Sequence, residues 1–236
     1  MANLVNLCAA AAAAAIIAAC SPSQSAPANN AQASSTVAAG ASGSAAAASQ
    51  GDPLVTAADK GRIDGDANAK TWLIVASDFQ CPFCKQWHDE SYRAIVNDYV
   101  RTGKIRVAYV NYPLGQHQNA VPTAEAAMCA SVQGKFWQYH DALFATQDKW
   151  AGLPMPSMLL DSIAGAVGLD KTAWKKCVDS GKMKPLIMAD RDRAAAAGVQ
   201  STPTFMLGNR IMQGSQPLSV MKAMLDSEVV KNSGTR

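Results

Sequence analysis

The sequence has little net charge, few cysteines and no long apolar run, and each shortage excludes a class of protein. Its 21 Lys and Arg residues against 18 Asp and Glu leave a net charge of +3, which is too weak for a nucleic-acid-binding surface. We therefore expect no nucleic-acid partner. Six cysteines in 236 residues are too few for a disulfide-stapled scaffold. No apolar run reaches the roughly 18 residues of a membrane-spanning helix. Hydrophobic residues still make up 49% of the chain, enough to bury the core of one folded domain.

Charge is missing altogether from the first part of the chain. No charged side chain precedes Asp52, and the Ala-rich apolar stretch Leu4–Ala19 has the length of the hydrophobic core of a signal peptide. The stretch runs into Ile17-Ala18-Ala19-Cys20, which resembles the lipobox of bacterial lipoproteins. That resemblance implies that residues 1–20 are a signal peptide and that Cys20 becomes a lipid-bearing mature N-terminus.

A second interpretation of this segment stays open. Export signals usually begin with positive charge, but Met1–Asn6 carries no Lys or Arg. An ordinary cleaved signal with an incidental cysteine would also fit. Residues 21–52 contain few large apolar side chains, which predicts a flexible tether. On either interpretation the folded part works outside the cytoplasm, in the periplasm or cell envelope, and the lipobox adds a lipid anchor to a membrane.

Residues 53–232 alternate between strand and helix signals and form the predicted folded domain. Short apolar runs predict buried strands, and apolar residues that recur at three- or four-residue steps predict helices. Glycines divide the long central helical tract. The predicted order is strand, helix, strand, a helical block, two strands and a helix, over residues 71–76, 82–102, 104–110, 121–197, 204–207, 211–212 and 217–230.

The first chemical signal is Asp78-Phe79-Gln80-Cys81-Pro82-Phe83-Cys84, where the first strand ends and a helix begins. Amides at a helix start favour a thiolate at Cys81, and Pro82 suits the first helical turn because its missing N–H needs no partner there. Cys81 would attack or be attacked in a mixed disulfide, and Cys84 would resolve it. Half of a zinc site is the alternative, completed by His88, His140 or another cysteine. Zinc sites of this kind usually show a second close cysteine pair, which this sequence lacks.

The second signal is Ser201-Thr202-Pro203-Thr204, immediately before the last two strands. With Asp78–Cys84, residues 126–141 and Gly198–Phe205 it resembles the thioredoxin superfamily, specifically the DsbA-like branch. This resemblance covers about residues 52–230. It implies an α/β protein with a thioredoxin fold and an inserted helical domain at about residues 115–197.

The resemblance also assigns roles to single residues. It implies that Pro203 is a cis-proline and that the backbone of Thr202 pairs with an extended substrate peptide beside Cys81. We expect Pro82 and Phe83 to form part of the same substrate-binding surface. From the residues alone, an ordinary trans-proline at a strand start is the alternative for Pro203.

One position departs from the family's pattern. Many thioredoxin-fold proteins carry a buried acid six residues before the first active cysteine, and Val75 stands there in this chain. Asp78 is closer to the motif, in the expected turn. A proton-shuttling carboxylate is therefore not predicted.

The remaining cysteines of the folded part, Cys129 and Cys177, lie in predicted helices. An oxidising compartment would join them in a structural disulfide if the fold brings them together. Two buried reduced cysteines in a well-packed core are the alternative.

Several other residues have plainer interpretations. We expect Lys85 to be a solvated lysine, although it could add positive charge beside Cys81, and we expect His117 to lie in a loop. The mixed charges of Asp190–Arg193 predict a solvated helix face. Aromatic side chains at helical spacing predict core packing for Phe136, Trp137, Tyr139 and Phe144.

Together these observations predict a cell-envelope thiol–disulfide oxidoreductase that introduces disulfides into exported proteins. No nucleotide loop or metal-ligand set is visible, so the dithiol itself is the redox group and we expect no cofactor or metal. The expected partners are reduced or unfolded exported proteins and a membrane redox partner that recycles the cysteines. A reductase or isomerase of the same fold, or a non-catalytic lipid-tethered binding module, are the alternatives.

Overall fold

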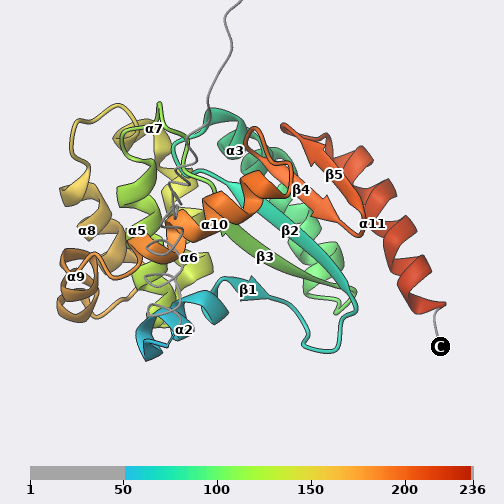
Figure 1. The fold of residues 1–236 in the computed structure, drawn as a ribbon, viewed down its shortest axis with the longest axis horizontal. Coiled ribbons are helices and arrows are strands. Elements are labelled where there is room, and N and C mark those ends of the chain that lie inside the picture. Colours follow the sequence, from blue (N-terminus) through green and yellow to red (C-terminus); the bar gives the residue numbers. More distant parts are fainter. Residues whose placement is uncertain (1–50, 235–236) are drawn as a thin grey trace, which may run out of the picture. The chain divides into compact units, whose positions relative to one another are not determined.

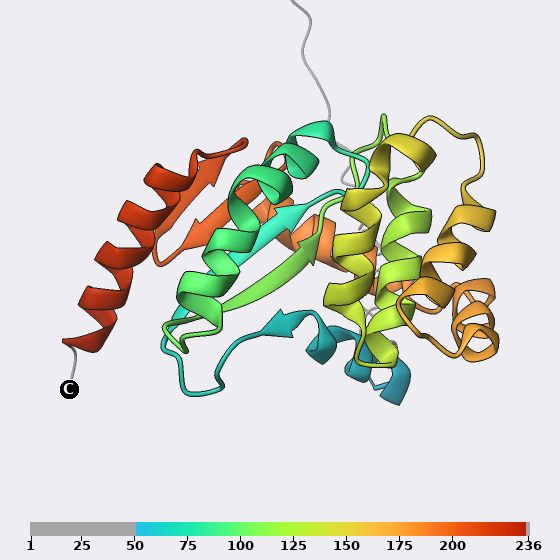
Figure 2. The same cartoon turned by 180° about the vertical axis from the view of Figure 1, so that it is seen from behind.

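The computed structural model describes residues 51–234, which contain a mixed β-sheet covered by helices (Figures 1 and 2). The strands are β1 (Ile63–Asp64), β2 (Thr71–Ser77), β3 (Ile105–Asn111), β4 (Thr204–Leu207) and β5 (Arg210–Gln213). Their order in the sheet is β1-β3-β2-β4-β5. Only the β2–β3 pair is parallel, and the other neighbours are antiparallel.

β2 lies at the centre of the sheet because its side chains are apolar on both faces. Val75 is opposite Tyr109 of β3 on one side and Phe205 of β4 on the other. A strand buried on both faces reads as a continuous apolar run, and the sequence of β2 has this pattern. The central position of β2 matters for the site, because the chain leaves its carboxyl end directly into the Cys81–Cys84 segment.

A long helical segment follows that turn and packs on one face of the sheet (Figure 2). It consists of α3 (Pro82–Trp87), the π-helical turn η1 (His88–Tyr92), α4 (Arg93–Ile95) and a second π-helical turn η2 (Val96–Val100). The C-terminal helix α11 (Leu218–Ser233) covers the same face. Apolar side chains from this segment and from α11 join the inward-facing residues of the sheet in one buried cluster.

The helices between β3 and β4 form the inserted helical block (Figure 1). Glycines with positive φ follow four of these helices, at Gly134, Gly168, Gly181 and Gly198. The block contains α5 (Ala120–Val132), α6 (Phe136–Ala145), α7 (Gln147–Trp150), α8 (Ser157–Ala166), α9 (Lys171–Asp179) and α10 (Lys184–Ala196). As expected from their spacing, the aromatic residues of α6 pack in the core: Phe136, Tyr139 and Phe144 are buried, and Trp137 is half-buried against them.

The structure adds two elements that the sequence did not predict. α2 (Pro53–Gly61) precedes β1, which forms a two-residue edge strand on β3. Asp52 caps α2 by accepting a hydrogen bond from the Leu54 amide at 2.9 Å. The helix packs on α5, so it belongs to the helical block despite its place at the start of the folded part.

One expectation about surface charge is wrong. Asp190, in the mixed-charge run of α10, is buried and not solvated. Its carboxylate pairs with the buried Arg62 guanidinium and accepts a hydrogen bond from Asn111 Nδ2 at 2.9 Å. The pair joins α10 to the segment between α2 and β1. Asp192, two residues on, is exposed as expected.

The helices described in residues 51–234 include none that is both long and apolar enough to cross a lipid bilayer. Cys20 lies outside the described residues, and so does the segment predicted as a tether, residues 21–52, except for its last two residues.

Candidate active site

Cys81 stands at the junction between the central strand and the helix that follows it. It is the N-cap residue of α3, with extended backbone dihedrals, and Pro82 occupies the first helical turn. The Cys81 amide donates to the Asp78 carbonyl at 3.1 Å, which closes the turn after β2. Cys84 follows one helical turn later, inside the core. Both thiols are free.

The pKa values of the two thiols are shifted in opposite directions. A hydrogen bond from Cys84 is the main cause that lowers the pKa of Cys81 to about 6, and Thr202 and the amides at the helix start add to it. Burial raises the pKa of Cys84 well above its ordinary value, and the neighbouring Cys81 raises it further. At neutral pH the pair therefore holds a thiolate at Cys81 and a thiol at Cys84.

The Thr202–Pro203 loop lies against the first of these thiols. The Thr202–Pro203 peptide bond is cis. The Cys81 thiol lies 3.4 Å from the Thr202 carbonyl oxygen, to which it donates when protonated. The Thr202 side chain is buried, and its hydroxyl has no hydrogen-bond partner among the described residues. The loop enters β4, which pairs with β2, so sheet pairing brings the two motifs together.

The surface beside this buried sulfur is apolar. Pro82 is exposed, and Phe83 exposes 60% of its surface even though it is a large aromatic residue. Cys81 itself exposes only 3%. A reacting partner must therefore come close to Phe83 and the Thr202–Pro203 loop before it reaches the sulfur.

A buried acid does lie near the cysteines, although at Asp78 and not at the family's usual position. Val75 occupies that position and is buried in the sheet. The Asp78 carboxylate accepts hydrogen bonds from the amides of Gln80 and Leu114, at 2.8 and 2.9 Å, and lies 2.7 Å from His117 Nδ1. Burial raises the pKa of Asp78 despite these bonds. His117 lies in a loop as expected, but it has this specific partner.

The helical block also holds the active-site turn, through residues that the sequence analysis did not single out. Gln147, at the start of α7, donates from Nε2 to the Phe79 carbonyl at 2.6 Å and to the Cys81 carbonyl at 3.1 Å. Gln80 donates to the Ala151 carbonyl at 2.7 Å. Nothing in the sequence distinguishes these glutamines from surface residues. Lys85 is partly buried and pairs with Asp89 at 2.7 Å, not with a sulfur.

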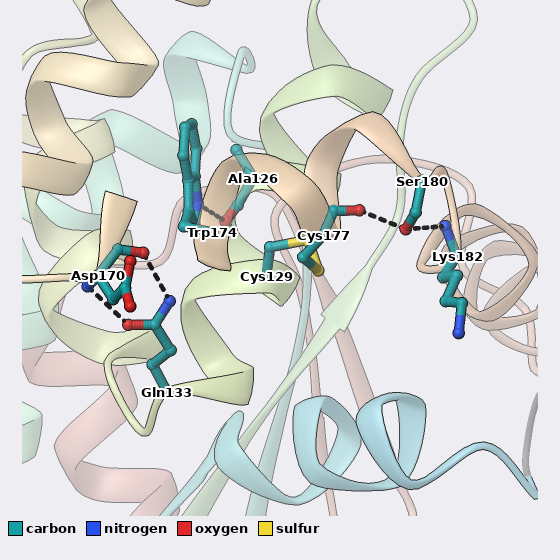
Figure 3. The surroundings of a disulfide bond; sticks show 8 residues. All are labelled: Ala126, Cys129, Gln133, Asp170, Trp174, Cys177, Ser180 and Lys182. Atoms are coloured by element: carbon teal, nitrogen blue, oxygen red, sulfur yellow. Dashed lines mark hydrogen bonds between the residues drawn. A yellow bond between two sulfur atoms is a disulfide. The ribbon is translucent and has the colours of Figure 1, made fainter. Parts of the chain in front are cut away.

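The structure joins Cys129 of α5 to Cys177 of α9 in a disulfide inside the helical block (Figure 3). Their Cα atoms lie 5.7 Å apart, within the range that a disulfide can bridge. Trp174, on the same helix as Cys177, donates to the Ala126 carbonyl of α5 at 2.9 Å (Figure 3). The bridge therefore reinforces a contact between two helices that also pack and hydrogen-bond.

The histidines offered as partners for a zinc site lie elsewhere. Within residues 51–234, Cys81 and Cys84 belong to no cluster of three potential metal ligands. His88 and His140 instead meet Asp141. The cysteine pair thus has the geometry of a dithiol centre.

Comparison with known proteins agrees with this geometry. The chain matches the thioredoxin family over residues 57–227. A curated relative, "Na(+)/H(+) antiporter NhaA 1" of Salinispora arenicola, is 31% identical over 75% of this chain. This chain spans only 26% of that antiporter's length. "Probable disulfide bond formation protein D" of Bacillus anthracis is 24% identical, over 71% of this chain and 77% of that protein.

Solved structures show the same fold. Wolbachia pipientis alpha-DsbA1 superposes with a TM-score of 0.65 and 22% identity, over 73% of this chain and 92% of that one. Oxidised BdbD from Bacillus subtilis gives a TM-score of 0.65 and 20% identity, over 72% and 94% of the two chains. The predicted thioredoxin fold with an inserted helical domain is confirmed.

Proposed function

The chain belongs to the thioredoxin family in its DsbA-like form, and we propose that it introduces disulfide bonds into exported proteins through Cys81 and Cys84. Its membership of this family is as the sequence predicted. Relatives named as protein-disulfide oxidoreductases, such as that of Rickettsia felis at 27% identity, agree with the predicted enzyme class. The direction of the reaction, its substrates and its location are our proposals.

The proposed reaction begins with the Cys81–Cys84 disulfide. A client thiolate attacks the Cys81 sulfur, the intramolecular disulfide breaks, and Cys84 leaves as a thiolate that takes up a proton. A second client thiolate then attacks the client's own sulfur in the mixed disulfide and releases Cys81 as a thiolate. Two client thiols become one disulfide, and the enzyme's disulfide becomes a dithiol. A membrane redox partner would reoxidise the dithiol.

The observation that carries this proposal is the stabilised thiolate of Cys81. A dithiol oxidises other proteins when its reduced form is the stabilised one, and the pKa of Cys81 lowered to about 6 is such a stabilisation. The Cys84 thiol suits the resolving role because burial raises its pKa and keeps it protonated, which makes it a poor nucleophile toward external disulfides. Exposed Pro82 and Phe83, with Thr202 and Pro203, would receive an extended client segment.

The reduction potential of the Cys81–Cys84 pair tests the direction. We expect roughly −200 to −120 mV, which is more oxidising than thioredoxin. The oxidised protein should form disulfides in a reduced unfolded substrate faster than its reduced form reduces insulin. Phe83→His should raise the potential further, since a protonated ring near Cys81 favours the thiolate. Fast insulin reduction with a potential below about −240 mV would make the protein a reductase.

We also propose that the protein is held at a membrane in the cell envelope by lipid on Cys20, with residues 21–52 as a tether. The lipobox resemblance and the absence of charge before Asp52 support this location. Partitioning of the expressed protein into a detergent phase tests the anchor. Cys20→Ala should move the protein into the aqueous phase, whereas Cys81→Ala should leave it in detergent. Unchanged partitioning of the Cys20→Ala protein would refute the lipid anchor.

A further inference from the structure

A second group of chemically active side chains lies outside the dithiol site, where the helix that follows the active-site turn meets α6. It consists of His88, which begins the π-helical turn η1, and the consecutive residues His140 and Asp141 of α6. We call these three residues the His–Asp cluster. π-Helical turns are rare and often mark functional positions. The cluster therefore combines an unusual backbone with an unusual set of side chains.

The ligand atoms of the His–Asp cluster converge on one point. Asp141 Oδ1 lies 2.8 Å from His140 Nδ1 and 3.3 Å from His88 Nε2. The three atoms all lie within 4.8 Å of one another. Both histidines are buried, but the Asp141 side chain is 55% exposed, which leaves one open side. An ion could enter from solvent past the carboxylate.

The partner of His88 Nδ1, on the side of the ring away from the cluster, affects whether Nε2 carries a proton or a lone pair. His88 Nδ1 lies 3.0 Å from Asp89 Oδ1, and Lys85 holds the other oxygen of that carboxylate. A proton on Nδ1 donated to Asp89 leaves a lone pair on Nε2. That lone pair would face a carboxylate oxygen of Asp141, which also offers only lone pairs. In this tautomer a positive charge, either a proton or a metal ion, must lie between them.

We propose that the His–Asp cluster binds one divalent ion of the first transition row, of the kind represented by zinc. His88 Nε2, His140 Nδ1 and an oxygen of Asp141 would be the ligands, and water would fill the open side. Two imidazoles and one carboxylate form a common ligand set for such ions. The Asp89 carboxylate behind His88 has the position of the second-shell acid that orients a metal-bound histidine.

The protonation states allow this ligation. A neutral imidazole offers a lone pair on one ring nitrogen and carries its proton on the other, so Nδ1 of His140 can act as the ligand. When Nδ1 binds the ion, the His140 proton lies on Nε2. The imidazole ring itself packs against the rings of Phe79, Tyr109 and Phe144, which meet it at steep angles. A proton held between His88 and Asp141 would pass to solvent as the ion enters.

An ion here would join two parts of the fold that the redox site depends on. His88 lies four residues after Cys84 on the same helical segment, while His140 belongs to the helical block. The His140 ring also packs against Phe79, at 5.8 Å between centroids, two residues before Cys81. The inference stands on this geometry and does not need the proposed redox direction.

Calorimetric titration of zinc chloride into the purified full-length protein tests the proposal. The Cys81–Cys84 pair is kept oxidised, so that its thiols cannot bind zinc. We expect one zinc ion per chain. Asp141→Asn, an isosteric change at a half-exposed position, should abolish binding, and Asp89→Asn should weaken it about 10–100-fold. His117→Gln removes a histidine outside the cluster and should leave zinc binding unchanged.

Cobalt(II) in place of zinc identifies the ligands through its visible absorption. The spectrum should report nitrogen ligation in the wild-type protein and should be lost in both His88→Gln and Asp141→Asn. The proposal is wrong if zinc binds no tighter than millimolar, or if Asp141→Asn and His88→Gln bind it as the wild type does. It is equally wrong if nitrogen NMR shows a doubly protonated His88 that zinc does not alter, since the carboxylates would then hold a proton only.

Discussion

The Cys81 sulfur lies 3.4 Å from the carbonyl oxygen of Thr202, a residue 121 positions further along the chain. The contact places a loop from the end of the chain's helical block directly against the thiol at the start of α3. It depends on the antiparallel pairing of β4 with β2, which carries the Thr202–Pro203 loop to the same end of the sheet as Cys81. The chemistry of Cys81 is therefore set by its own helix and by this distant loop.

The two thiols should react with alkylating reagents at very different rates and with different dependence on pH. With a pKa of about 6, Cys81 should react about tenfold faster at pH 7 than at pH 5, because the thiolate is the nucleophile. Cys84 should stay slow over this range, since burial raises its pKa. Iodoacetamide labelling followed by mass spectrometry measures both rates. Two equally inert thiols would favour the non-catalytic binding module.

The same acidity should appear in the stability of the reduced protein. The pKa of Cys81 is lowered from 9.0 in the folded state, so its thiolate stabilises that state above the pKa of the unfolded thiol. This contribution is lost as the pH falls through about 6. We therefore expect the free energy of unfolding of the reduced protein, relative to that of the oxidised protein, to be higher at pH 8 than at pH 5. Denaturation of both forms at the two pH values measures this. A difference independent of pH would contradict the assignment.

Single-cysteine variants should assign the two roles. Cys84→Ala cannot resolve a mixed disulfide, so it should accumulate covalent complexes with client proteins. Cys81→Ala should accumulate few, because burial raises the pKa of Cys84 and keeps it a weakly nucleophilic thiol. Non-reducing electrophoresis of cells that express each variant compares them. Equal trapping by both variants would refute the assignment of Cys81 as the attacking thiol.

Loss of the Cys129–Cys177 bridge should destabilise the folded part. The bridge spans 48 residues of sequence, and closing such a loop stabilises by up to about 4 kcal/mol on chain-entropy grounds. We expect Cys129→Ala/Cys177→Ala to lower the denaturant midpoint. The comparison is made in a Cys81→Ala/Cys84→Ala background, where no other disulfide of the folded part can form. An unchanged midpoint, or free thiols at both positions, would argue against a structural bridge.

Asp190→Ala should be among the most destabilising changes on α10. It removes the buried partner of Arg62, whose guanidinium then keeps only the half-exposed carboxylate of Asp59, and losing such a buried pair costs up to about 3–5 kcal/mol. Asp192→Ala, an exposed position in the same run of charges, is the matched control and should change the stability by less than about 0.5 kcal/mol. Equal effects in chemical denaturation would mean that Asp190 is solvated.

Local sequence signals located the central strand, the active-site helix and the last hairpin because each of these signals depends on neighbouring residues alone. The apolar run of β2, the proline after Cys81 and the Gly208-Asn209 turn need no distant partner to be recognised. Glycines likewise marked the ends of helices in the inserted block. α2 escaped notice because it is short and buries only two side chains, Val55 and Ala58.

Polar residues with distant partners could not be assigned in this way. Asp190 and its partner Arg62 lie 128 residues apart, and in the sequence Asp190 is indistinguishable from the exposed Asp192 beside it. Gln147 and His117 have the same difficulty, since each looks like a surface residue until its partner near Cys81 is known.

Most of the elements and the dithiol can be predicted from the sequence alone, because periodicity, helix-start chemistry and the spacing of Cys81 and Cys84 are properties of adjacent residues. The groups that surround them come from distant parts of the chain: Thr202 lies against Cys81, Gln147 beneath the active-site turn, and His88 against Asp141. These neighbours cannot be predicted locally, because burial and hydrogen bonding depend on what the fold brings within a few ångströms. A one-dimensional pattern records which groups are available, and the packing of the sheet against the helical block selects their partners.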